Sequence, residues 1–132
     1  MTEVEQTNRP DKRLYRITPA GREALQQWLA NPDVEPDVFK SPLLLHLFFG
    51  HLLPRQVLIA HLERRQQKLA AELQGYEKRE QEVRDSMQAP GAEANLPFLL
   101  LTFQFQRNMI QAALQWATET VAQLKRLKET AA

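Results

Sequence analysis

The chain has 132 residues and a formal net charge of +1, so its overall charge favours neither a nucleic acid nor an acidic partner. It contains no cysteine, which excludes disulfides, Cys-based zinc sites and thiol catalysis and is compatible with a reducing cytoplasm. No apolar run approaches the roughly 18 residues of a membrane span, and residues 1–10 are too acidic and polar for a secretory signal. These properties predict a soluble cytoplasmic protein without membrane association.

The first 17 residues predict a β-hairpin. Residues 13–17 alternate in the manner of a strand, and a turn rich in Asn, Pro and Asp separates them from residues 1–6. An isolated two-stranded hairpin is only marginally stable in water, so we expect this one to need support from another element. Basic side chains crowd the segment although the net charge of the chain is near zero.

A short amphipathic helix is predicted directly after this hairpin. Thr18 offers a side-chain oxygen as N-cap, and Pro19 suits the first helical position because its missing N–H needs no partner. Apolar residues then recur at helical spacing, namely Ala24, Leu25, Trp28 and Leu29. Asn31 and Pro32 predict the end of the helix.

The order of hairpin and helix, with RLYRITPAGREAL over residues 13–25, resembles the wing and following helix of PadR-family transcription regulators, which are winged helix-turn-helix proteins. In that family a helix-turn-helix precedes the wing, and nothing in this sequence corresponds to it. The chain therefore looks like a PadR-type regulator that begins at an internal methionine and lacks its recognition helix. The resemblance implies that basic residues of the wing contact DNA, namely Arg9, Lys12, Arg13 and Arg16.

Residues 33–40 contain a proline and three acids and predict a linker. Ser41 and Pro42 then repeat the pattern of cap and proline, which predicts a helix through roughly Leu52. This helix is apolar on most of its sides, so we expect it to be buried.

A long heptad pattern predicts the third helix, from Pro54 to about Met87. Its core positions alternate at spacings of three and four: Ile59, Leu62, Gln66, Leu69, Leu73, Tyr76, Glu80, Val83 and Met87. Residues 89–92 break the pattern, Asn95 is a candidate cap for the next helix, and that fourth helix is predicted to continue to about Glu129.

The fourth helix carries apolar residues on two faces, and one neighbouring helix cannot cover both. One face contains Leu99, Phe103, Ile110, Ala113, Ala117, Val121 and Leu124, and the other contains Phe98, Phe105, Met109, Ala112 and Trp116. Helices of about 50 Å also exceed the diameter of a compact globule of this length. We therefore predict a symmetric homodimer whose interface contains Leu62, Leu69, Leu73, Tyr76, Leu99, Phe103, Ile110 and Trp116.

The helical part is similar to the C-terminal dimerisation domain of PadR/AphA-type regulators, also called the virulence-activator C-terminal domain. The predicted fold class is therefore mainly α, with a remnant winged-helix β-hairpin and a helical dimerisation domain of two long antiparallel helices. The predicted domains are 1–31, the wing hairpin and following helix, and 32–132, the dimerisation domain.

The sequence predicts no catalytic site, no cofactor and no metal site. It contains no Gly-rich phosphate loop, nucleophile elbow or catalytic dyad. His46, His51 and His61 have no metal-ligand spacing, and the Glu residues of the third helix lie among Lys and Arg as on a solvated helix surface, with weak pairs such as Glu80 with Arg84. The resemblance to PadR regulators implies a small hydrophobic or aromatic effector, and several aromatic residues could line its pocket, although core packing explains them equally well: Phe48, Phe49, Phe98, Phe103, Phe105 and Trp116.

We therefore expect a PadR-like regulator fragment that dimerises, with DNA as a partner of the full-length protein. The rival hypothesis is a stand-alone helical interaction module that pairs with a full-length regulator or another protein. Translation of the DNA upstream of Met1 separates the two, because an open frame encoding a helix-turn-helix supports the first and an immediate stop codon supports the second.

Overall fold

The computed structural model describes residues 2–5 and 13–127, and of residues 2–5 and 13–15 it describes the backbone alone. The chain forms two compact units, Met1–Lys40 and Ser41–Ala132. The boundary between these units follows Lys40. The predicted domains, 1–31 and 32–132, stay a prediction.

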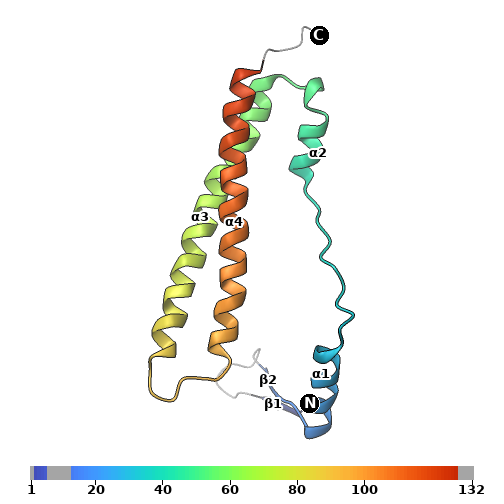
Figure 1. Cartoon of the computed structure of the whole chain (residues 1–132), viewed down its shortest axis with the longest axis vertical. Helices are drawn as coiled ribbons and strands as arrows, with labels where there is room; N and C mark the ends of the chain where they lie inside the picture. The colour runs from blue at the N-terminus through green and yellow to red at the C-terminus, as the bar shows by residue number, and fades with distance from the viewer. Residues whose placement is uncertain (1, 6–12, 128–132) are drawn as a thin grey trace. The chain divides into compact units, whose positions relative to one another are not determined.

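The first unit contains two short strands and one helix (Figure 1). Strands β1 (Thr2–Glu5) and β2 (Arg13–Arg16) are antiparallel, and their register places Thr2 opposite Arg16. Helix α1 (Pro19–Ala30) begins as predicted, since the Oγ1 of Thr18 accepts a hydrogen bond from the backbone N–H of Gly21 at 3.0 Å.

The predicted fold class is wrong in one respect, because a remnant of a winged-helix domain is not present. The sheet contains only β1 and β2, which pair with each other, and no helix-turn-helix accompanies them among the described residues. No residue of α1 is buried, and its Trp28 side chain is 74% exposed. An isolated two-stranded hairpin is only marginally stable in water, and the other described elements are helices, so the fold is mainly helical.

The second unit is entirely helical over its described residues. It contains α2 (Pro42–Phe48), the 3-10 turn η1 (Gly50–Leu52), α3 (Arg55–Met87) and α4 (Leu96–Arg126). The Oγ of Ser41 caps α2 as predicted, accepting from the backbone N–H of Leu44 at 3.4 Å. The helix ends at Phe48, however, and none of its residues is buried, so the predicted buried helix through Leu52 is wrong for the single chain.

Helices α3 and α4 lie side by side as an antiparallel hairpin (Figure 1), as the heptad pattern predicted. With 33 and 31 residues they are each about 45–50 Å long. Gly91 has a φ of +74° in the loop that joins them, where L side chains are strained. Asn95 precedes α4, but its side chain makes no capping hydrogen bond, so that part of the prediction is wrong.

The core lies almost wholly between α3 and α4. Its buried apolar residues are Leu58, Leu62, Leu69, Val83, Ile110, Ala117 and Val121. Among the described residues, no helix combines the length and the apolar character that crossing a membrane requires.

We predict opposite effects for two Gly→Ala substitutions. A Cβ at Gly75, inside α3, meets no atom within 4 Å, so Gly75→Ala should stabilise the fold by about 0.5–1 kcal/mol through helix propensity. A Cβ at Gly91 also meets no atom, but the positive φ strains Ala there, so Gly91→Ala should destabilise the fold by about 1 kcal/mol. Urea denaturation at one protein concentration measures both, and a stabilised Gly91→Ala variant would contradict the loop conformation.

Candidate interaction surface

The inner face of α4 is covered by α3. Ile110, Ala117 and Val121 of α4 are buried against the heptad positions of α3, of which Leu62 is fully buried. Three residues predicted for a dimer interface, Leu62, Leu69 and Ile110, therefore have their side chains covered within one chain and have little surface left for a partner.

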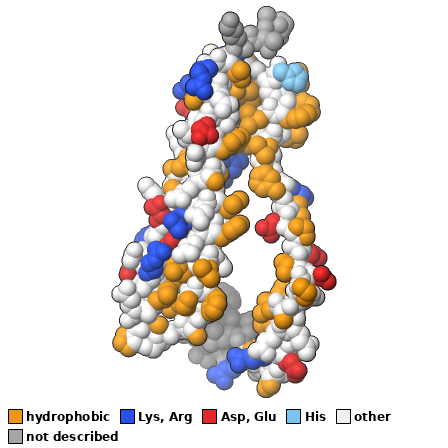
Figure 2. Space-filling view, viewed as in Figure 1, with side chains coloured by type: hydrophobic (Ala, Val, Ile, Leu, Met, Phe, Trp, Pro, Cys, Tyr) orange, Lys and Arg blue, Asp and Glu red, His pale blue; other side chains and the backbone are white. Residues whose placement is uncertain are grey.

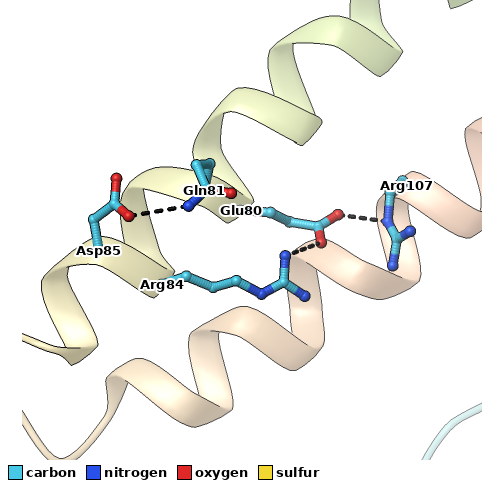
Figure 3. A network of polar contacts seen from close by, with 5 residues as sticks. All are labelled: Glu80, Gln81, Arg84, Asp85 and Arg107. Atoms are coloured by element: carbon cyan, nitrogen blue, oxygen red, sulfur yellow. Dashed lines mark hydrogen bonds and ion pairs between the residues drawn. The ribbon is translucent and has the colours of Figure 1, made fainter.

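A buried carboxylate lies in the same contact (Figure 3). Glu80 of α3 is only 3% exposed, and the Nε of Arg107, on α4, lies 2.6 Å from its Oε1. The Nε–H of Arg107 is not directed at Oε1 of Glu80 as a hydrogen bond requires, so this contact is an ion pair. An NH₂ group of Arg84 lies 3.5 Å from the other carboxylate oxygen, Oε2. The prediction that Glu80 occupies a solvated surface is wrong, whereas its heptad position correctly placed it in the contact.

Two further side-chain contacts cross between the helices. The side-chain amide of Gln66 donates to the hydroxyl of Thr118 at 3.0 Å. The rings of Tyr76 and Phe103 meet edge to face, with centroids 6.1 Å apart. Leu73, Tyr76 and Phe103, all predicted for the dimer interface, are half-buried.

The described residues of the second unit leave the outer face of α4 exposed. Five large apolar side chains follow one another at spacings of three, four or seven residues, with exposed fractions of 69, 59, 53, 51 and 37%: Phe98, Leu101, Phe105, Met109 and Trp116. We call these five residues the α4 stripe. They lie within a segment of 19 residues and extend over about 27 Å of helix. All but Leu101 belong to the second apolar face predicted from the sequence.

Apolar side chains of the second unit also reach the surface outside α4. Figure 2 shows them over α2. The exposed members in and after α2 are Leu44, Leu45, Phe48, Phe49, Leu52 and Leu53. Contiguous exposed apolar surface of this kind is typical of an interaction site.

Of the four residues predicted to contact DNA, the structure describes two. Arg13 and Arg16 are the first and last residues of β2, and the side chain of Arg16 is exposed. Arg9 and Lys12 lie outside the described residues.

The described residues contain no group of three or more side chains suited to a metal ion. His46 and His61 nevertheless meet edge to face, with ring centroids 5.4 Å apart, which their separation in the sequence did not reveal. The aromatic residues predicted for an effector do not line either of the two depressions described on α2 and α3.

Residues 39–125 match the family model described as virulence activator alpha C-term. The structure is similar to that of the PadR-like transcriptional regulator BC1756 from Bacillus cereus, with 19% sequence identity and a TM-score of 0.68 over 93% of this chain and 67% of that one. It is also similar to smu.1604c from Streptococcus mutans UA159, with 23% identity and a TM-score of 0.55 over 86% of this chain and 67% of that one. The comparison with curated proteins found no match.

We predict that Arg107→Ala destabilises the fold by about 2–3 kcal/mol, because Glu80 is left buried without its main partner. Arg84→Ala, the matched control, should cost less than about 1 kcal/mol because Arg84 is more exposed and farther from the carboxylate. Replacing Glu80 and Arg107 together by Leu should return stability to within about 1 kcal/mol of the parent. Urea denaturation measures all three, and equal losses for the two single Arg variants would contradict this assignment.

Proposed function

We propose that this chain, which belongs to the virulence activator alpha C-terminal family, is the dimerisation module of a PadR-like regulator and that its α4 stripe pairs with a second copy. The observation that carries the proposal is the exposure of the stripe along a helix whose other apolar face is already covered. Burying the remaining exposed part of each large side chain contributes about 1–2 kcal/mol, which favours association.

The residues predicted for the interface form two groups, those already covered within the chain and those whose side chains remain available to a second copy. Leu99 and Trp116 are each 37% exposed and are retained in the proposed interface, with Leu73, Tyr76 and Phe103 at its edge. Phe98, Leu101, Phe105 and Met109 extend it along α4. The exposed apolar side chains of α2 supply further surface for the second copy.

A role for the dimer in transcription regulation extends the proposal. Two copies held at a fixed spacing would present two DNA-reading domains to two half-sites of one operator in the cytoplasm. The basic segment at Arg13 and Arg16, with Arg9 and Lys12 before it, would contact phosphates. A small hydrophobic or aromatic effector that binds the exposed aromatic residues of α2 and α4 would shift this spacing. This function requires no catalysis.

The dimer is tested by placing charge in the stripe. Phe105→Glu with Met109→Glu should convert a dimer at micromolar concentration into a monomer, because two buried carboxylates without partners oppose association. We expect the dissociation constant to rise at least about 100-fold, as for the loss of interface hot spots. Sedimentation equilibrium measures it.

The control for this test is Gln111→Glu, an exposed position of α4 outside the stripe, which should leave the dimer intact. Circular dichroism shows whether the helices persist in both variants. A monomeric parent chain, or a Phe105→Glu, Met109→Glu variant that is still a dimer of unchanged affinity, would contradict the proposed interface.

The DNA contact is tested separately by salt titration of duplex DNA binding. In a full-length version of the protein, Arg13→Ala with Arg16→Ala should weaken binding of unrelated sequences alike and reduce the slope of log K against log salt concentration by about 2, or 1 per lost phosphate contact. Lys78→Ala, an exposed position of α3, is the control and should leave the slope unchanged. An unchanged slope in the double variant would exclude these residues from the DNA contact.

A further inference from the structure

A depression between α2 and α3 is lined mainly by nitrogen-bearing side chains. Its volume is about 280 Å³, and apolar atoms of Pro42 and Leu43 form one part of its wall. The remaining lining residues are His46, His61, Arg64, Arg65 and Lys68. No acidic residue belongs to the lining.

The positions on α3 explain why these charges converge. Residues 61, 64, 65 and 68 recur at helical spacing and therefore share one face of the helix. Arg64 and Lys68 are four residues apart, a like-charge spacing that costs a helix a few tenths of a kcal/mol. The ion pairs among the described residues of this unit both use Glu80, so none of these pairs involves the cations of the depression. The depression thus concentrates positive charge that an anion would offset.

The two histidines add oriented hydrogen-bonding groups. The Nδ1 of His46 lies 2.7 Å from the backbone oxygen of Pro42, and a carbonyl oxygen only accepts, so Nδ1 carries the hydrogen and donates. In the neutral ring the Nε2 of His46 then carries no hydrogen, and it donates to an oxygen of a phosphate dianion only when the ring is protonated. The edge-to-face contact between His46 and His61 holds this ring at the α2 side of the depression.

We propose that this depression binds a small phosphate-bearing molecule. Arg64, Arg65 and Lys68 carry three positive charges, which complement the two negative charges of a phosphate dianion better than they complement the one charge of a carboxylate. The guanidinium group of arginine also forms bidentate hydrogen bonds with phosphate. The volume is several times the roughly 30 Å³ share of one water, so it also admits an organic body, which Pro42 and Leu43 would contact. The inference is independent of the proposed function, since it requires neither a dimer nor DNA.

The test uses phenyl phosphate and benzoate as probes, titrated into the whole chain in phosphate-free buffer by isothermal calorimetry. We expect phenyl phosphate to bind at least about tenfold more tightly than benzoate, and Arg64→Gln with Lys68→Gln to weaken it by at least about tenfold, the loss expected for charge-assisted hydrogen bonds. Lys78→Gln with Lys125→Gln removes the same net charge at exposed positions outside the lining and should leave the affinity unchanged.

Several results would overturn the assignment. One is the absence of phenyl phosphate binding up to millimolar concentrations, and another is equal weakening by the two double variants, which would indicate a diffuse charge effect. Equal affinity for benzoate would remove the preference for phosphate. Loss of duplex DNA affinity in the Arg64→Gln, Lys68→Gln variant, with phenyl phosphate binding unchanged, would assign these cations to nucleic acid. Circular dichroism confirms that each variant is folded.

Discussion

The structure depends on the packing of one long helix against another that is apolar on two sides. Helix α3 covers the face of α4 that carries Ile110, Ala117 and Val121, and an antiparallel partner cannot also reach the opposite face. The α4 stripe is therefore left exposed by geometry. This constraint links the fold to the proposed function, since α3 covers only one of the two apolar faces and no other described element of the unit covers the stripe.

Polar groups within the same packing determine how the two helices align. Glu80 and Gln66 both occupy heptad core positions of α3, and each meets a specific partner on α4, Arg107 and Thr118 respectively. A sliding of one helix along the other would leave Glu80 buried without a counter-charge, which is costly. We infer that these contacts specify the register of the hairpin and hence the position of the α4 stripe on its surface.

Much of the helical unit was predictable because its signals are local. Heptad spacing, caps at Thr18 and Ser41 and the break near Gly91 together located the helices, and the two faces of α4 followed from the period of its apolar residues. The errors concern relations between elements. The burial of Glu80 depends on Arg107 across the hairpin, and the burial expected for α2 requires surface that the single chain does not provide.

The same limit applies to the candidate sites and to the first unit. His46 and His61 lie on different helices, so no spacing in the sequence could place their rings together.

The central claim, that a second copy covers the α4 stripe, is tested most directly by Trp116, the only tryptophan left in a Trp28→Phe variant. The account predicts that acrylamide quenches its fluorescence weakly at micromolar protein and more strongly as dilution separates the copies. Strong quenching that is the same at every protein concentration would contradict it.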